Sequence, residues 1–370
     1  MTSVSTTVVA GLAAAVAAQQ LEFDPAQNAV AARLDALAAV LRSRARPRGL
    51  LARLAAGARA GGARDAPRGI YLWGGVGRGK THLLDLFYAS LDLPQRERTH
   101  YYRFMQSVHA ELRAARRRSD PLEIVAASFA ARARVLCLDE FFVSDIADAM
   151  LLSGLLAGLI RRGVVLVATS NLPPHELYAG GLQRERFLPA VALLERHLDV
   201  LHLDGAADYR LRRLESAHTY WDCARPGTAA ELRRLFDALT HGAAAGPTDV
   251  VIAGRSIAAV AAGPGTAWFE FAALCAGARS AEDYIELAHL YQTLILADVP
   301  VMTAADDDAA RRFVTLIDEL YDRGVKLVVS AAAPPGELYR GERLRFEFAR
   351  AASRLVEMQS QTYLSRQHRA

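Results

Sequence analysis

Residues 74–81 form the first of three stretches whose residue types and spacing could carry out chemistry. They read GGVGRGKT and fit the pattern G-x-x-x-x-G-K-[ST] of a phosphate-binding loop. Glycines permit a tight turn that points backbone N–H groups at a phosphate, and the helix that follows adds its positive N-terminal end. The predicted nucleotide-binding residues are Gly74, Gly75, Val76, Gly77, Arg78, Gly79, Lys80 and Thr81.

Lys80 and Thr81 have separate predicted roles in this loop. The Lys80 ammonium would reach the outer phosphates of a nucleotide such as ATP, and the Thr81 hydroxyl would ligate Mg²⁺. Of the 44 basic residues only Lys80 and Lys326 are lysines, so lysine stands where arginine does not serve. A compact ammonium fits inside a closed loop, whereas a guanidinium is a wide planar fork. Composition therefore argues against a chance match to the pattern.

The second stretch, residues 135–141, is a run of four apolar residues that leads into two acids, Asp139 and Glu140. This pattern is typical of a buried parallel strand that ends at a ligand crevice. Asp139 would hold the Mg²⁺ shell, and Glu140 would orient and polarise a water molecule. The alternative is a strand end that merely carries two acids. Because small-molecule kinases need no water-activating acid there, Glu140 favours nucleotide hydrolysis.

The third stretch begins at Asn171, which follows a predicted strand over residues 164–169. Its amide could hold the attacking water or sense the terminal phosphate, and the alternative is an Asn turn before Pro173-Pro174. Arg184 and Arg186 come next, and their spacing puts them on different faces of a helix. One of them could act as an arginine finger on the nucleotide of a neighbouring subunit. The alternative is a surface helix with salt bridges.

Alternating strands and helices must position these residues. Asp24-Pro25 predicts a helix start, and residues 42–67 predict a mobile link. Phe104 and Met105 are interpreted as core residues, with a loop facing a central pore as the alternative. The predicted strands lie at residues 70–73, 100–105, 135–138 and 164–169, and the predicted helices at 80–91, 106–118 and 144–160.

The C-terminal part contains an internal repeat. Residues 162–180 align with residues 323–341, and 11 of the 19 positions are identical. Asp298 falls near the place of Asp139, Ala332 stands where Asn171 does, and the second copy has no phosphate loop. Either a strand–helix–strand unit was duplicated, or two segments converged on one turn design. Predicted strands lie at 250–260, 266–271, 294–299 and 325–330, predicted helices at 283–291 and 309–322, and an exit strand with helices at 209–241.

Length and composition bound the class of protein. A chain of 370 residues with 52% hydrophobic residues and a net charge of +4 suggests two or three globular units. The basic run Arg116–Arg118 favours a solvated helix face over a nucleic-acid patch. Cys137, Cys223 and Cys275 lack metal-ligand spacing and indicate reduced thiols. The apolar run Val8–Ala18 is too short to span a bilayer and lacks a basic region before it, so we expect a cytoplasmic protein without a membrane span. The alternative is a weak signal or transit peptide.

The order of these motifs resembles that of AAA+-type ATPases. It is more closely similar to the ZapE cell-division ATPases of bacteria and to their mitochondrial relatives, the lactation elevated proteins. The resemblance covers nearly the whole chain from about Leu21, and its most specific part is the run QRERFLP at residues 183–189. The other matching stretches are residues 24–27, 139–141, 145–149, 171–174, 181–182, 353–355 and 357–358.

The resemblance implies ATP hydrolysis, an AAA+-like core, oligomerisation, and a role in cell division or protein quality control. It also implies that Arg354 is a second sensor arginine that touches the nucleotide. Arg78 departs from the family pattern, which commonly has a small residue such as Thr there, and this bears on the turnover rate more than on binding.

We therefore predict an α/β protein with a P-loop NTPase core, a mainly parallel sheet and helices on both faces. The predicted domains are a helical lead-in and linker at 1–66, an ATPase core at 67–215, and a C-terminal α/β region with the degenerate repeat at 216–370. The predicted function is a homo-oligomeric ATPase that remodels a protein target. The alternative is a nucleic-acid motor or helicase loader, which a steep salt dependence of nucleic-acid binding would favour.

Overall fold

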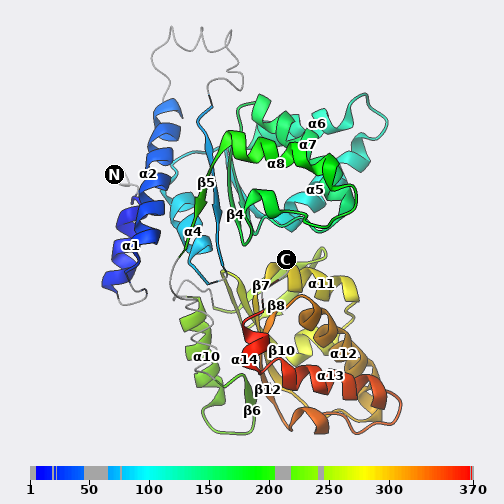
Figure 1. Ribbon diagram of the computed structural model, residues 1–370. Helices are drawn as coiled ribbons and strands as arrows, with labels where there is room; N and C mark the ends of the chain where they lie inside the picture. Colours follow the sequence, from blue (N-terminus) through cyan, green and yellow to red (C-terminus); the bar gives the residue numbers. More distant parts are fainter. Residues whose placement is uncertain are drawn as a thin grey trace. The chain divides into compact units, whose positions relative to one another are not determined.

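The computed structural model describes residues 6–18, 21, 23–45, 66–75, 77–204, 218–240, 246–366 and 368 of the chain (Figure 1). It divides into two compact units, residues 1–206 and residues 207–370, and each has its own sheet and core. Within the described ranges, no helix is both long enough and apolar enough to cross a membrane.

The first unit alternates strands and helices after two N-terminal helices. Its elements are α1 (Val8–Ala17), α2 (Pro25–Ala45), β1 (Gly69–Trp73), α4 (Lys80–Ser90), β2 (Arg96–His100), α5 (Tyr101–Ala115), α6 (Pro121–Arg132), β3 (Val135–Asp139), α7 (Ile146–Arg161), β4 (Val165–Ser170), the short 3-10 helix η1 (Pro174–Glu176), α8 (Arg184–His197) and β5 (Leu198–His202). The sequence pattern did not predict α6 or β5.

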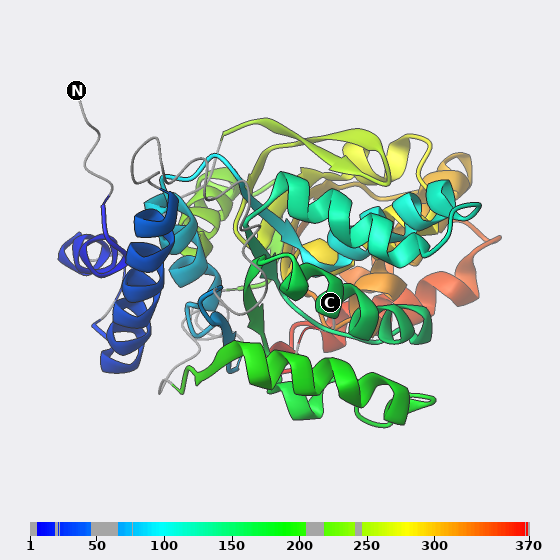
Figure 2. The same cartoon turned by 90° about the horizontal axis from the view of Figure 1, so that it is seen from above.

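The sheet of the first unit has the strand order β2-β3-β4-β1-β5, and all its neighbouring strands are parallel. Successive residues of a strand point to opposite faces, so each strand packs on two helical layers. Ile70 and Leu72 of β1 pack with α1, α2 and α4, whereas Tyr71 packs with α5, α6, α7 and α8. The unit is therefore a three-layer α/β structure, and Figures 1 and 2 both show α1 and α2 side by side on one of its faces.

The predicted helix start at Asp24-Pro25 is confirmed. Asp24 Oδ1 accepts the backbone N–H of Ala26 at 2.8 Å, and α2 begins at Pro25. The residues of α2 that the structure buries include Val30 and Leu34, which contact the α4 layer. This packing places the N-terminal helices in the core of the first unit.

The strand predicted over residues 100–105 is wrong. The strand β2 is Arg96–His100, and Tyr101 begins the helix α5. All five residues of β2 are polar and half-buried, because β2 is an edge strand. Phe104 and Met105 are buried in the α5 layer, as the core interpretation predicted, and the pore-loop alternative is wrong.

The second unit also alternates strands and helices, with a hairpin inserted near its start. Its elements are β6 (Tyr220–Asp222), α10 (Thr228–Leu239), β7 (Thr248–Ile252), β8 (Arg255–Ala259), β9 (Ala261–Gly263), β10 (Thr266–Glu270), the π-helical turn η2 (Ala272–Ala276), α11 (Ala281–Leu290), β11 (Thr293–Val299), the 3-10 helix η3 (Ala304–Asp306), α12 (Asp307–Asp322), β12 (Lys326–Ala331), the 3-10 helix η4 (Pro335–Glu337), α13 (Arg345–Glu357) and α14 (Gln361–Leu364). The single strand predicted over 250–260 is two strands, because Ala253 and Gly254 have positive φ and form a tight hairpin turn.

The second unit repeats the strand order of the first. Its sheet has the order β6-β12-β11-β10-β9, so β6, β12, β11 and β10 correspond to β1, β4, β3 and β2 in both sheet order and chain order. The pairs β6-β12, β12-β11 and β11-β10 are parallel, as are the corresponding pairs β1-β4, β4-β3 and β3-β2 of the first sheet. The helix α10 packs on one face, and α11, α12 and α13 pack on the other. The duplication therefore extends well beyond the strand–helix–strand segment that the sequence shows.

In the second half of each copy, corresponding elements are separated by a constant number of residues. The elements α12, β12, η4 and α13 begin 161 residues after α7, β4, η1 and α8. The carbonyls of Leu172 and Ala333 are also 161 residues apart, and each accepts a bond from a tyrosine of the corresponding strand: Tyr71 Oη donates to Leu172 at 3.0 Å, and Tyr220 Oη donates to Ala333 at 2.7 Å. A shared turn design does not explain equivalent bonds from different strands, so this agreement favours duplication.

The loop between β6 and α10 stands in the place of the phosphate loop. A glycine with positive φ precedes the helix in both copies, Gly79 at +89° and Gly227 at +92°. Thr228 takes the place of Lys80, and its hydroxyl donates to the carbonyl of Asp222 at 2.8 Å. The second copy therefore keeps the turn and has a neutral side chain where the first has a cation.

The register of the sheets fixes which strand residues correspond. Leu138 of β3 pairs with Ala168, and Leu296 of β11 pairs with Val329, which follows Ala168 by 161 residues. Leu138 and Leu296 thus occupy the same place in the two sheets.

The residue two positions after each of these leucines is an acid in the left-handed region. Glu140 has φ +52° and Asp298 has φ +59°. The backbone N–H of Glu140 donates to Thr169 Oγ1 at 3.1 Å, and that of Asp298 donates to Ser330 Oγ at 2.9 Å. The alignment of Asp298 with Asp139 is therefore wrong: Asp298 corresponds to Glu140, because each lies two residues after the leucine that occupies the same place in its sheet.

Candidate active site

The phosphate loop joins the end of β1 to the start of α4, and Val76 lies outside the described residues. A Cβ added at Gly79 would lie 2.9 Å from Gln27 Nε2, and the positive φ of Gly79 independently favours glycine. Gln27 is buried at the start of α2, and its Nε2 donates to the carbonyl of Arg78 at 3.0 Å. This contact ties α2 to the loop.

Lys80 lies in a cage of oxygen atoms at the start of α4. Its Nζ donates to the carbonyls of Gly74 at 2.7 Å and Gly75 at 2.6 Å, and to Asn171 Oδ1 at 2.9 Å. The residue is only 8% exposed. These oxygen acceptors suit the donors of an ammonium group. The structure thus brings Lys80 and Asn171 together, and it supports the prediction that the loop closes around a compact cation.

The other predicted loop residues lie around this cage. Gly77 has φ +72°, and the N–H of Gly74 donates to the carbonyl of Ser170 at 3.3 Å. Arg78 is half-buried, and its Nη1 is buried without a hydrogen-bond partner in the described part of the chain. Thr81 is the second residue of α4 and is half-buried.

Asp139 ends β3 with its carboxylate buried. Its Oδ2 accepts a hydrogen bond from Arg98 Nε at 2.7 Å, and its Oδ1 is buried with no hydrogen-bond partner among the residues described. Burial raises the pKa of the Asp139 carboxyl above its ordinary value, and the Arg98 guanidinium beside it opposes that rise. An orphaned carboxylate oxygen fits Mg²⁺, which proteins bind through one or two carboxylates together with substrate phosphates.

Glu140 is the first residue after β3, and its backbone leaves the strand direction through a left-handed φ. Such a conformation is uncommon outside glycine. Neighbouring bonds hold it: the N–H of Phe141 donates to the carbonyl of Thr169 at 2.6 Å, and Ser170 Oγ donates to the carbonyl of Phe141 at 2.7 Å. The turn is thus fixed against β4, the strand that Asn171 follows.

The two predicted finger arginines differ in their surroundings. Arg184 begins α8, is half-buried, and donates from Nη2 to the carbonyl of His175 at 2.5 Å. Arg186 is exposed, and Leu182 and Leu188 beside it are 70% and 43% exposed. Of the two, Arg186 has the guanidinium that is open to solvent.

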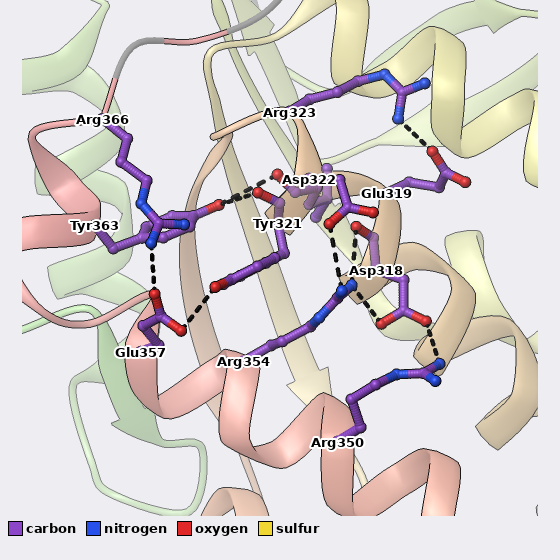
Figure 3. Close-up of polar contacts among 11 residues, drawn as sticks. Asp318, Glu319, Tyr321, Asp322, Arg323, Arg350, Arg354, Glu357, Tyr363 and Arg366 are labelled. Atoms are coloured by element: carbon purple, nitrogen blue, oxygen red, sulfur yellow. Dashed lines mark hydrogen bonds and ion pairs between the residues drawn. The ribbon is translucent and has the colours of Figure 1, made fainter.

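Arg354 lies on α13 of the second unit, where Figure 3 shows it inside an ionic cluster. Its Nη1 pairs with Asp318 Oδ1 at 2.8 Å, and its Nη2 pairs with Asp322 Oδ1 at 3.3 Å. The guanidinium also lies over the ring of Tyr321, 4.5 Å from the centroid. Arg350 pairs with the other oxygen of Asp318 at 2.6 Å. These contacts support a clamp between α12 and α13, and the sensor role stays a prediction.

Replacing Arg354 by alanine distinguishes the clamp from the sensor. We expect Arg354→Ala to lower the free energy of unfolding by about 1.5–3 kcal/mol, the usual range for hydrogen bonds to charged groups. Arg350→Ala is the matched control: its side chain is 55% exposed, so about 0.2–1 kcal/mol is expected. Chemical denaturation and ATP-analogue binding measure the two effects. A loss of nucleotide affinity at unchanged stability would instead support the sensor.

The sequence pattern did not single out Gln27 or Arg98 as functional residues. Gln27 lies in one of the stretches that carry the family resemblance, which was an available signal. Arg98 lies in the polar strand β2, whose position was predicted wrongly, so its contact with Asp139 had no local signal.

A family model and individual relatives each match most of the chain. The family described as AFG1-like ATPase matches residues 6–367. The chain is 52% identical over 303 residues to the cell division protein ZapE of Escherichia coli K12, covering 82% of this chain and 81% of that protein. It is 34% identical over 343 residues to the lactation elevated protein 1 homolog B of Danio rerio, covering 80% of this chain and 68% of that protein.

Solved structures match smaller parts of the chain. AMPPCP-bound DnaA from Aquifex aeolicus is 14% identical with a TM-score of 0.35, covering 53% of this chain and 52% of DnaA. PCH-2 of Caenorhabditis elegans is 17% identical with a TM-score of 0.31, covering 59% of this chain and 49% of PCH-2.

Proposed function

The chain belongs to the AFG1-like ATPase family, and from that premise we propose that its ATP site is the cage around Lys80. It is a ZapE-type, P-loop AAA+ ATPase. One observation carries the assignment of the site: Lys80, Asn171, Asp139 and Glu140 lie at the carboxyl ends of the adjacent strands β1, β4 and β3. Ligands of open α/β sheets bind at this edge.

Each residue has one task in the proposed mechanism. Lys80 would bind the outer phosphates of ATP with the donors that now meet the loop carbonyls. Thr81 and Asp139 Oδ1 would hold Mg²⁺, which would neutralise part of the negative charge of the phosphates when bound. Glu140 would orient the attacking water and accept its proton. Asn171 would hold that water or the terminal phosphate.

The variant Glu140→Gln tests the chemical step. The glutamine keeps the shape of the side chain and leaves Asp139 in place, and it removes the base. We expect ATP to bind while turnover falls about 10²–10⁴-fold, the range for a lost general acid–base group. Phosphate release and binding of a fluorescent ATP analogue measure the two quantities.

The second unit offers the matched control. Asp298 occupies the place of Glu140 in that copy, so Asp298→Asn should leave ATP turnover unchanged. If Glu140→Gln hydrolysed ATP as fast as the parent, Glu140 would be a structural acid at a strand end.

We propose that the chain acts as a homo-oligomer on a protein target, and that this target belongs to the cell-division machinery. The name of its ZapE relative and the exposed arginine beside exposed leucines at the start of α8 support this. Three cysteines outside any disulfide support a cytoplasmic location. The Glu140→Gln protein, which would hold ATP, should capture the target in a pull-down. The double variant with Lys80→Ala should not, and equal capture by both would count against an ATP-dependent target.

A further inference from the structure

Arg98 on β2 connects the end of β3 to the helix α4, which carry the two residues of the proposed Mg²⁺ site. Its Nε donates to Asp139 Oδ2 at 2.7 Å, and its Nη1 forms an ion pair with Asp85 Oδ1. Asp139 ends β3, whereas Asp85 lies on α4, four residues after Thr81. Residues four apart share a face of a helix. One guanidinium therefore joins the metal-binding carboxylate to the helix that carries the proposed metal-binding hydroxyl.

The same bond decides which oxygen of Asp139 is available. Oδ2 is taken by Arg98, and Oδ1 is buried without a hydrogen-bond partner in the described ranges. A guanidinium is planar with donors in fixed directions, so the bond restricts rotation of the carboxylate. The side chains are 9% exposed at Asp139 and 21% exposed at Arg98, so water competes little for this bond.

We infer that Arg98 is a positioning residue for the metal-binding carboxylate, holding Asp139 Oδ2 so that Oδ1 is left for Mg²⁺. Asp85 in turn holds Arg98. This inference rests on the proposed ATP site and adds a residue that acts through Asp139 rather than on the nucleotide. The competing explanation is that Arg98 only balances the charge of a buried acid and fastens the edge strand β2.

Arg96 provides a matched control for that explanation. It lies two residues before Arg98, on the same face of β2. Its Nη1 donates to the carbonyl of Tyr88 on α4 at 2.7 Å, and its guanidinium lies 4.7 Å from the centroid of the Tyr88 ring. Arg96 thus fastens β2 to the same helix through a tyrosine rather than through a carboxylate.

The test titrates Mg²⁺ into full-length protein with a fluorescent ATP analogue and compares Arg98→Met with Arg96→Met. In EDTA, Arg98→Met should bind the analogue like the parent. We expect its Mg²⁺ concentration at half-saturation to rise about 10–100-fold, the range for a lost outer partner of a metal ligand. Arg96→Met should keep the parent value. Arg98→Lys should recover part of the loss, because an ammonium can still donate to Asp139 but lacks the fork that spans two carboxylates.

The variant Asp139→Asn separates failure of this inference from failure of the proposed site. If Asp139→Asn loses the Mg²⁺ response and Arg98→Met keeps it, the metal site stands and the positioning role is overturned. If Asp139→Asn also responds normally, the site itself is wrong. Should Arg98→Met fail to fold, Asp85→Asn replaces it, since this change removes only the outer anchor. For Asp85→Asn, a smaller rise in the Mg²⁺ concentration at half-saturation supports the inference. An unchanged Mg²⁺ concentration at half-saturation overturns it.

Discussion

The Lys80→Ala variant is expected to lose both ATP binding and ATP turnover. The Lys80 ammonium is buried among three oxygens, in a site where water screens charge poorly. Truncating one partner of a buried, hydrogen-bonded charge pair costs about 2–5 kcal/mol of binding free energy. Losing one donor to the charge of the transition state costs a further factor of about 10²–10³ in turnover. Analogue binding and phosphate release report the two losses separately.

Lys80→Arg should not restore either quantity, because the cage around Nζ fits a compact ammonium. Lys326 supplies the control. Its Nζ donates to the carbonyls of Gly324 at 2.8 Å and Arg366 at 2.6 Å and faces the ring of Tyr363. Lys326→Arg should lower the midpoint of thermal unfolding and leave ATP binding unchanged. Near-normal hydrolysis by Lys80→Arg would contradict the need for a compact cation.

Removing the arginine pair at the start of α8 is expected to cost turnover without costing ATP binding. The γ-phosphate develops negative charge on its oxygens during transfer, and a guanidinium supplied there is worth about 10³–10⁵ in turnover. We expect Arg184→Ala/Arg186→Ala to fall by that factor. Among single variants Arg186→Ala should lose more, because Arg184 is bonded to the carbonyl of His175 and Arg186 is exposed.

A mixing experiment shows whether the arginine acts on a neighbouring subunit. The Arg184→Ala/Arg186→Ala protein keeps an intact loop, and the Lys80→Ala protein keeps intact arginines. Each should be nearly inactive alone, and together they should recover part of the activity, since some interfaces would pair an intact loop with an intact arginine. Absence of recovery in verified mixed oligomers would mean that the arginines serve their own subunit or only hold the interface.

Sequence reasoning located the strand ends that carry chemistry because their signals are local. The phosphate loop and the Asp139-Glu140 pair are each a continuous run that follows a buried apolar strand, and the structure has β1 and β3 at those places. The rarity of lysine was also informative. Lys80 and Lys326 each lie among carbonyl oxygens in an arrangement that suits an ammonium group.

The features that sequence reasoning missed depend on partners far along the chain. Gln27 meets the loop 51 residues away, and Arg98 meets Asp139 41 residues away. The strand β2 is polar because it lies at the edge of the sheet, so hydrophobic periodicity moved the prediction onto the apolar start of α5. The extent of the duplication was hidden because β6 and α10 share little more than Tyr220 and Gly227 with their counterparts.

The left-handed acid after the third strand of each copy has a consequence for how active-site strain is interpreted. Glu140 and Asp298 share the conformation and the bond to a hydroxyl on the next strand, although Thr228 replaces the lysine in the second copy. A backbone outlier costs of order 1–3 kcal/mol and is usually attributed to the demands of catalysis. Here the copy without the cation retains it. The conformation therefore does not depend on the phosphate-loop cation, and the bond to the hydroxyl on the next strand accompanies it in both copies.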